Sequence, residues 1–451
     1  MKTLNRRDFL KTSGAAALFA ATPGLAYSQV VGGVAPFTDY KALVCVFLFG
    51  GNDSFNMLVP NTTAEYNAYA ASRQNLALLR EDLLPITPAS LAGPDFGLHP
   101  AMGGVHGLFQ SGSAAFVTNV GPLIESTTKD EYFNKSVKLP PQLFSHNDQQ
   151  DQWSSLRGNV PSKTGWAGRM ADLIRDGVAG QQMATNASLS GSNLFQSADE
   201  TVAYVMGQNG PIQFSGFSTE PGSLLNEQRL AFLRVVNAQY NSVYERGFAE
   251  VQRRAIAAAD TVSEAIAGGP TINTVFPQSQ LGNQLQTVAR LIAVRDELQM
   301  QRQVFFVATG GFDSHDDQNQ NQPALLGGIS DAIAAFHAAT VELNIGDSVT
   351  TFTQSDFGRT LTSNGDGTDH AWGGNQLVVG GAVNGGDLYG NFALLEIGGP
   401  EDVGGGRMIP SMSADQYAAT LARWFGIPDA DLGVVAPNLA NFAQRDLGFM
   451  I

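Results

Sequence analysis

Three short apolar runs, each ending in polar or glycine residues, constrain the fold of this chain more than any other feature. They cover residues 43–49, 304–309 and 348–353. Runs of this length are typical of strands that are buried on both faces of a parallel sheet. In open parallel sheets, ligands bind beyond the carboxyl ends of the strands. The sequence therefore predicts one site that the ends of these three strands share.

Aspartate and histidine residues follow all three runs. Asp53 follows the first, Asp313 and His315 follow the second, and Asp356 and His370 follow the third. Carboxylate and imidazole ligands without cysteine are typical of hydrolytic divalent-metal sites. We expect Asp313, His315 and His370 to hold one ion, and Asp53 and Asp356 to hold a second. Two ions about 4 Å apart can clamp the attacking and leaving oxygens of a displacement at phosphorus or sulfur.

The candidate nucleophile is a serine. Ser145 precedes a predicted helix, whose dipole and free N–H groups favour an anionic oxygen, and Ser54 is the second choice. Arg359 or Arg169 is expected to hold a tetrahedral anion. His146 stays open between two interpretations, a side chain that faces the site and a part of the helix cap.

Strand and helix patterns alternate along the rest of the chain. Further strands are predicted at residues 114–120 and 376–379, a loop at 92–100, and helices at 278–300, 322–343 and 415–425. This alternation predicts an α/β fold, a three-layer α/β/α sandwich around a mainly parallel sheet. We expect one domain over residues 41–451.

A helical insertion is expected inside this domain, at residues 178–275. Its first part, from Gly180 to Gly222, is rich in Gly, Ser, Asn and Gln, which predicts irregular or short-strand structure near the surface. Apolar residues then step by three and four from Leu230 to Ile266. They predict one long amphipathic helix, or two with a break at Gly247. Core packing is its favoured role, and a lid or an interface is the alternative.

The N-terminus has the pattern of a twin-arginine signal peptide. Residues 5–11 (NRRDFLK) precede a short apolar stretch and a small-residue cleavage site that ends at Ala26. The apolar stretch is well short of the roughly 18 residues that a membrane span needs. We expect a cleaved signal at residues 1–26, a linker at 27–40 and the twin-arginine translocase as a partner. The mature protein would be periplasmic or extracellular, without an integral membrane span.

The charge and the cysteine content exclude several classes of function. The formal charge is −15, and removal of residues 1–26 leaves 22 basic and 40 acidic residues, a charge of −18. Such a surface repels nucleic acid and anionic lipid headgroups. Cys45 is the only cysteine, which excludes an internal disulfide and a thiolate metal cluster.

Several motifs resemble those of one bacterial family. They are residues 49–56 (FGGNDSFN), 145–151 (SHNDQQD), 310–316 (GGFDSHD), 354–359 (QSDFGR), 369–374 (DHAWGG), and Gly406-Arg407 with residues 415–425 (DQYAATLARWF). They span nearly all of the mature chain and resemble the family catalogued as domain of unknown function 1501 (DUF1501). Its members typically carry twin-arginine signals, and it is usually placed in the alkaline phosphatase and sulfatase superfamily.

The resemblance implies an alkaline-phosphatase-like sandwich that hydrolyses phosphate or sulfate esters with two metal ions. Carried over position by position, it implies the same two ligand sets that the strand ends predict. Ser145 falls nearest to the nucleophile's usual place. The chain departs from the superfamily at Asp356-Phe357, where Asp-His is common, and in the short spacing of Asp313 and His315.

We therefore expect an exported hydrolase of phosphate or sulfate esters, acting on a small anionic ester. It would use one or two divalent ions per chain, either zinc or magnesium, manganese or calcium. The alternative is a non-catalytic exported protein for binding or assembly, on the same fold with a degenerate metal site. Phe357 and the lack of an evident nucleophile motivate this alternative.

Overall fold

The computed structural model describes residues 36–91, 93, 95–158, 160–211 and 218–451. The expected signal peptide and residues 27–35 of the expected linker lie outside the described residues. Residues 36–451 cluster into one unit by their contacts, and the fold below is that of this unit.

The centre of the fold is a nine-stranded sheet within these described residues. Its strands are β1 (Lys41–Leu48), β5 (Ala114–Gly121), β6 (Asn186–Ser188), β7 (Tyr204–Val205), β8 (Arg302–Thr309), β9 (Val349–Ser355), β10 (Gly374–Gly380), β11 (Leu388–Tyr389) and β12 (Met412–Ser413). The order is β11-β5-β10-β9-β1-β8-β6-β7, with β12 beside β5. Most neighbours pair in parallel, whereas β10 runs antiparallel to both β5 and β9.

The register aligns the carboxyl ends of the three central strands. Leu48, at the end of β1, lies opposite Thr309 of β8 and Ser355 of β9. The loops that follow these strands therefore leave the sheet at one edge, as the apolar runs predicted.

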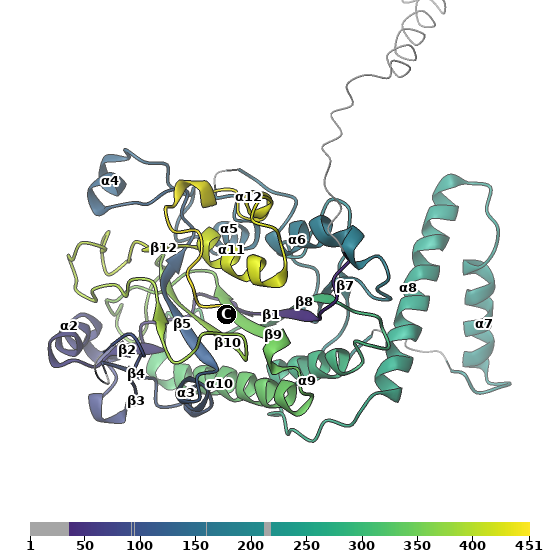
Figure 1. Ribbon diagram of the computed structural model, residues 1–451, viewed down its shortest axis with the longest axis horizontal. Coiled ribbons are helices and arrows are strands. Elements are labelled where there is room, and N and C mark those ends of the chain that lie inside the picture. Colours follow the sequence, from purple (N-terminus) through teal and green to yellow (C-terminus); the bar gives the residue numbers. More distant parts are fainter. Residues whose placement is uncertain (1–35, 92, 94, 159, 212–217) are drawn as a thin grey trace, which may run out of the picture. The chain divides into compact units, whose positions relative to one another are not determined.

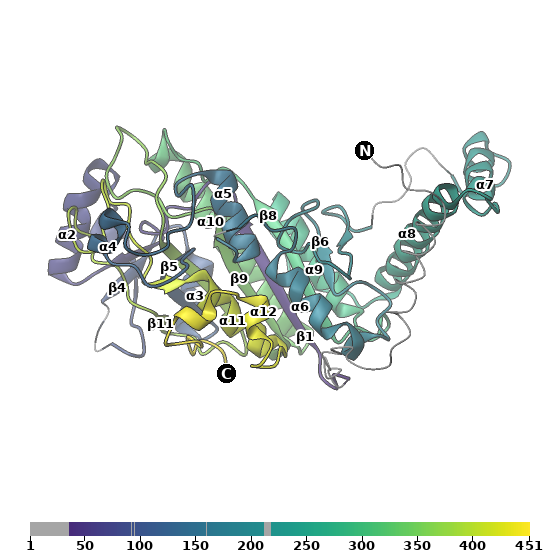
Figure 2. The same ribbon diagram turned by 90° about the horizontal axis from the view of Figure 1, so that it is seen from above.

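Helices cover both faces of the sheet (Figures 1 and 2). One face carries α5 (His146–Ser155), α6 (Trp166–Ile174), α11 (Ala414–Phe425) and α12 (Leu432–Val435), and the other carries α3 (Gly103–Gln110), α9 (Gln280–Ala293) and α10 (Gln318–Glu342). The predicted three-layer α/β fold with a mainly parallel sheet is confirmed.

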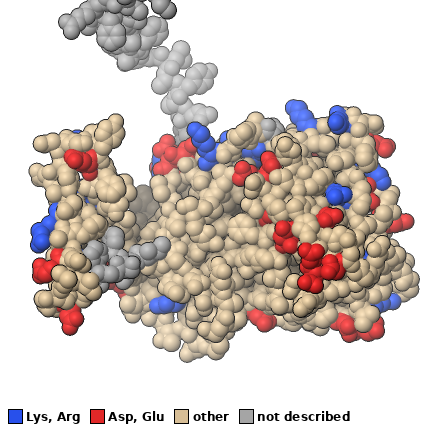
Figure 3. Space-filling model, turned by 180° about the vertical axis from the view of Figure 1, so that it is seen from behind, with Lys and Arg blue, Asp and Glu red and all other residues tan. Residues whose placement is uncertain are grey.

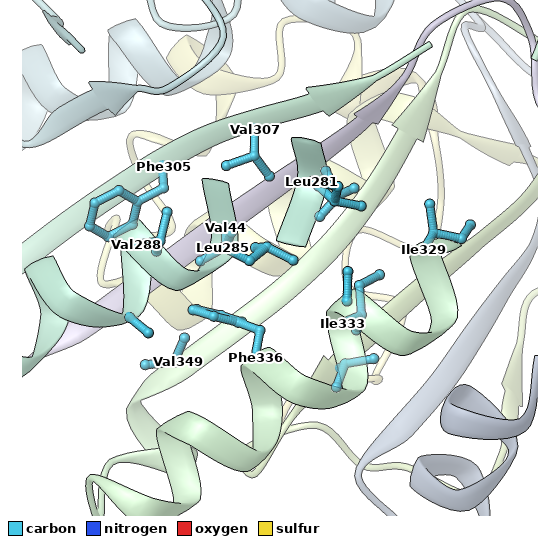
Figure 4. Close-up of a cluster of buried hydrophobic side chains, with 14 of the residues drawn as sticks. Val44, Leu281, Leu285, Val288, Phe305, Val307, Ile329, Ile333, Phe336 and Val349 are labelled. Carbon is cyan, nitrogen blue, oxygen red and sulfur yellow. The ribbon is translucent and has the colours of Figure 1, made fainter. Parts of the chain in front are cut away.

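Two apolar cores lie between these layers. Val44 and Val46 of β1 pack towards α9 and α10, whereas Leu43 and Cys45 pack towards α6 and α11. Figure 4 shows the first core, where Leu285 and Phe336 from the two helices meet the sheet. Because neighbouring strand residues point to opposite faces, a continuous apolar run serves both cores. Each such buried side chain stabilises the fold by roughly 1.5–3 kcal/mol.

A small second sheet was not predicted. Its strands are β2 (Leu58–Pro60), β4 (Phe96–Leu98) and β3 (Leu84–Ile86), all antiparallel. β4 falls inside the stretch expected to be a loop, and that expectation was wrong. Two further helices are α2 (Thr63–Arg73), which contacts β2, and α4 (Lys129–Asn134). A three-residue strand has too few residues to show a period in the sequence.

The expected insertion differs in detail from its prediction. Two helices, α7 (Leu224–Val236) and α8 (Val243–Gly268), replace one long helix, and Gly247 lies inside α8 rather than at the break. Within the stretch expected near the surface, β6 is buried and pairs with β8.

One described helix, α10, has the length and apolar composition of a membrane span. Core helices pass the same test, and α10 packs on α3, α9 and the sheet through ten buried residues.

Candidate functional site

The loops after β1, β8 and β9 meet at one edge of the sheet. The Gly50 backbone N–H, after β1, donates to Oδ1 of Asp356 after β9, at 3.2 Å. Gly50 has φ +117°, and a Cβ there would lie 2.3 Å from the backbone nitrogen of Asp313. Only glycine permits this approach of the loops, which brings Asp313 and Asp356 to the turn that follows β1.

Three imidazoles surround one carboxylate oxygen at this edge. The Oδ1 atom of Asp313 lies 3.1 Å from Nε2 of His315, 3.4 Å from Nε2 of His370 and 3.6 Å from Nε2 of His146. The Nε2 atoms of His315 and His370 are 2.9 Å apart. His146 comes from the first turn of α5, so a helix of one layer adds to what the strand ends supply.

The other ring nitrogen of each histidine meets an oxygen atom. The pairs are His146 Nδ1 with Asp356 Oδ2 at 2.6 Å, His315 Nδ1 with Asp369 Oδ1 at 3.2 Å, and His370 Nδ1 with the Phe144 carbonyl at 2.9 Å. Carboxylate and carbonyl oxygens accept hydrogen bonds, so Nδ1 donates in each pair. In a neutral ring Nε2 then carries the lone pair, and each of the three Nε2 atoms lies within 3.6 Å of Asp313 Oδ1.

Two overlapping sets of three donors fit a divalent ion. One is His146, Asp313 and His370, and the other is His315, Asp313 and His370. Nitrogen and oxygen ligands that are about 2.0–2.1 Å from an ion lie roughly 3.4 Å apart at tetrahedral angles. The donor–donor distances of 2.9, 3.1, 3.4 and 3.6 Å bracket that value. Donor atoms of His146, Asp313 and His370 all lie within 4.8 Å of one another. Orientation of each ring through Nδ1 is also the usual outer shell of metal-bound histidine.

The surroundings of Asp313 and His370 lower the pKa of both side chains, which favours an anionic carboxylate and a neutral imidazole. Burial alone would raise the pKa of Asp313, but the hydrogen bond and charge of Arg359, with His315 and His146, hold it below its ordinary value. Burial lowers the pKa of His370, against the opposing hydrogen bond to Phe144. An anionic carboxylate and a neutral imidazole are the forms that bind metal.

Arg359 is directed at protein oxygens rather than at an open anion site. Its buried guanidinium donates to the carbonyls of Gly50, Gly51 and Thr368 and forms an ion pair with Asp313. The expectation that it holds a tetrahedral anion therefore does not match its placement, because all three of its nitrogens are engaged. It fixes Asp313 and the turn after β1.

Asp53 does not join the histidines. It is buried, forms an ion pair with Arg73 and accepts from Gln318. In the part of the chain that the structure describes, no hydrogen bond or ion pair links it to the three histidines. The Asp53 carboxylate is buried and is engaged by Arg73 and Gln318, so its role as a ligand stays a prediction.

Asp356 lies behind His146 rather than beside the central oxygen. It is completely buried, and Gln150 Nε2 donates to its Oδ2 at 2.8 Å. Phe357, also buried, packs against His146 and His370 with ring centroids 4.8 and 4.7 Å away. Phe357 is thus an apolar wall of the site.

Ser145, Ser54 and Arg169, the remaining candidates, each form hydrogen bonds to other groups of the protein. Ser145 is the N-cap of α5, and its Oγ donates to Oδ2 of Asp148 at 2.6 Å. Ser54 is buried, and its Oγ accepts from the Asn375 backbone at 2.7 Å, which removes it from the site. The buried Arg169 donates to four main-chain carbonyls, so the structure gives it a packing role.

His146 is the site residue that the sequence left open. Its chain neighbours offered one signal: it follows the candidate nucleophile Ser145 at a helix start. That signal equally fits a helix cap. Only the packing of α5 on β9 places the ring beside Asp356, 210 positions later in the chain.

Comparison with known families gives two matches. The model of the family described as "Protein of unknown function (DUF1501)" matches residues 40–402. The model of the TAT (twin-arginine translocation) pathway signal sequence matches residues 3–23, so the predicted export across the cytoplasmic membrane is confirmed. The search of curated proteins found no match.

Similar solved structures include two at low identity. Ps i-CgsB, in complex with k-i-k-neocarrahexaose, has 9% identity and a TM-score of 0.36, over 90% of this chain and 77% of that one. The lipoteichoic acid synthase LtaP from Listeria monocytogenes has 10% identity and a TM-score of 0.31, over 89% and 78%. Likenesses this distant carry no argument about activity.

Proposed function

We propose, since this chain belongs to the DUF1501 family and bears a twin-arginine signal, that it is an exported hydrolase of phosphate or sulfate esters. It would depend on one divalent ion held by His146, Asp313, His315 and His370. The family description assigns no activity, so the support comes from the geometry of the site.

One observation carries the metal dependence. The Nε2 atoms of His315 and His370 are 2.9 Å apart, while their Nδ1 atoms donate to oxygens elsewhere. Two lone pairs at that distance repel each other unless a proton or a metal ion lies between them, and a metal ion leaves both Nδ1 hydrogen bonds in place. Imidazole ligands favour zinc over magnesium or calcium. One ion is proposed rather than two, because among the described residues no hydrogen bond or ion pair links the buried Asp53 to the three histidines.

A bound divalent ion would polarise an ester oxygen at this site and stabilise developing negative charge. Ser145 is the proposed nucleophile, because it stands between Phe144 and His146, both of which contact the site. As Oγ of Ser145 bonds to phosphorus or sulfur, its proton would pass to Asp148 and the bond to the alcohol oxygen would break, with that oxygen taking a proton from water. A water molecule would then cleave the seryl ester, releasing phosphate or sulfate and returning the hydroxyl to Ser145. The side chain of Asp313 is 48% exposed, so a substrate can reach the cluster.

The test measures metal content and ester turnover on the exported protein. We expect about one zinc per wild-type chain by mass spectrometry, with turnover of an aryl phosphate or an aryl sulfate. His370→Ala should lose both, whereas Ser145→Ala should keep the metal and lose turnover. His106→Ala, on α3, is the matched control. Metal-free wild-type protein, or full turnover in His370→Ala, would refute the proposal.

One observation favours the alternative of a binding or assembly protein. Tyr244, Phe248 and Val251 form one stripe along α8, with exposed fractions of 87%, 68% and 63%. Apolar stripes of this kind mark interaction surfaces. If no ester is turned over with any divalent metal, while Phe248→Ser abolishes association that the wild type shows, the alternative replaces the hydrolase.

A further inference from the structure

We propose that Asp356 is a positioning residue that fixes the tautomer of His146. The carboxylate holds the ring proton on Nδ1, so that Nε2 keeps its lone pair for the ion. This inference rests on the proposed metal site and deepens it, because it changes Asp356 from an expected ligand into the group that prepares one.

The contacts of Asp356 are all those of an acceptor. Oδ1 accepts from the Gly50 backbone, and Oδ2 accepts from Gln150 Nε2 and from His146 Nδ1. Since the first two donors are N–H groups of fixed polarity, the carboxylate meets His146 as an acceptor as well. The distance of 2.6 Å to Nδ1 is the shortest of the three histidine–oxygen pairs.

The sheet anchors Asp356 firmly. The preceding Ser355 is the last residue of β9, and its Oγ donates to the Leu48 carbonyl at 2.6 Å and accepts from the Asn52 backbone at 2.8 Å. His146, by contrast, belongs to α5. The Asp356–His146 hydrogen bond therefore orients a ligand from the helical layer by means of a carboxylate that the sheet holds.

The other two histidines are less suited to the same control. Asp369, the partner of His315, has a half-exposed side chain and lies 3.2 Å from the ring nitrogen. The partner of His370 is a backbone carbonyl, which no side-chain substitution removes. Asp356 is thus the position where one substitution can change a ring tautomer inside the site.

The substitution Asp356→Asn tests the proposal with almost no change in volume. The amide oxygen can keep the hydrogen bond from Gly50, which directs the amide NH₂ towards His146. Because that group donates, Nδ1 must accept, and the ring proton moves to Nε2. Metal affinity should fall roughly 10- to 100-fold, the usual effect of losing such a partner. Asp366→Asn, an exposed acid of the same loop, is the matched control.

Two measurements separate this role from a merely structural one. Long-range ¹⁵N–¹H NMR of the metal-free protein should show His146 protonated on Nδ1 in the wild type and on Nε2 in Asp356→Asn. Competition with a chelator should show the loss of zinc affinity in Asp356→Asn alone. Nε2 protonation in the wild type would overturn the proposal even if the variant failed to fold.

The outcomes distinguish this inference from the proposed hydrolase. Wild-type zinc affinity in Asp356→Asn overturns the positioning role and leaves the hydrolase standing. A wild-type protein that turns over no ester, but binds zinc and loses affinity in Asp356→Asn, overturns the hydrolase and supports the positioning role.

Discussion

Asp53 and Arg73 form a buried ion pair, which engages a carboxylate that could otherwise bind a metal ion. Asp53 and Arg73 are both almost completely buried, and Gln318 donates to the same carboxylate. A buried ion pair is weak evidence for stability as a whole, but removal of one partner leaves an uncompensated charge in the interior. Arg73 thus neutralises an acid that the strand-end pattern had assigned to a second metal.

Arg73→Met should destabilise the protein by about 3–5 kcal/mol, because the Asp53 carboxylate stays buried without its cation. Urea unfolding measures the free-energy change. The double variant Arg73→Met with Asp53→Asn serves as the control and should recover much of the loss. A loss below about 1 kcal/mol in the single variant would mean that water or a metal ion replaces the guanidinium.

At the residue scale, the sequence predicted the strand-end residues better than their partners. Asp313, His315 and His370 follow predicted strands, and the structure brings them together. The roles of Asp53 and Asp356 depend on Arg73 and His146, which lie on other elements. A pattern within one chain segment cannot show which distant side chain packs against it.

Helix α11 begins with a buried acid. Ser413 caps the helix, and Gln416 completes a capping box. Asp415, in the first turn, accepts from the Asn438 backbone at 2.8 Å. Burial raises its pKa to about 7, against the lowering effect of these hydrogen bonds. The start of α11 therefore contributes a pH-dependent free energy.

The free energy of unfolding should fall as the pH rises from about 4 to 7. In that interval the folded state holds a proton on Asp415 that the unfolded state has released, so the slope is negative, at most about 1.4 kcal/mol per pH unit. Urea unfolding across this range, with Asp415→Asn beside the wild type, measures it. Asp415→Asn should make the slope of the free energy of unfolding against pH less negative, and the exposed control Asp296→Asn should leave it unchanged. If Asp415→Asn shows the same slope as the wild type, a group other than Asp415 causes the pH dependence.

The apolar periodicity of the sequence predicted where strands and helices form, but it predicted their first and last residues less accurately. Strand β9 and helix α11 lie within a few residues of the predicted ranges, because apolar spacing is strong there. The alternative with two helices predicted the break between them at Gly247, yet Ser242 caps α8 by accepting from the Glu245 backbone. The Ser-x-x-Glu capping signature stood in the sequence and identifies the helix start better than glycine does.

At the scale of the whole molecule, the fold and the export signal agree with the sequence. The three-layer sandwich followed from alternating patterns, while the small sheet of β2, β3 and β4 did not. On the face shown in Figure 3, one larger group of acidic side chains stands out, further acidic side chains are scattered over the surface, and basic ones lie mostly singly. The exclusion of nucleic acid as a partner stays a prediction from the formal charge of −15.

Replacing both Arg6 and Arg7 by lysine should abolish export. The twin-arginine pair is the feature that the pathway reads, and the signal match covers it. Cell fractionation with immunoblotting should find the variant in the cytoplasm and the wild type in the periplasm or medium. Lys11→Arg is the control that keeps the pair. Export of the double variant would assign the protein to another route.

The position of β1 has a consequence for synthesis on the ribosome. β1 lies between β8 and β9, and its first partner residue in β8, Arg302, is made 261 residues after Lys41. At roughly 5–20 residues per second, the nascent chain carries this apolar strand unpaired for tens of seconds. Chaperones that bind emerging chains therefore have a defined segment to protect. A chain whose synthesis ends before β9 would contain β1 with no strand to pair with on one side.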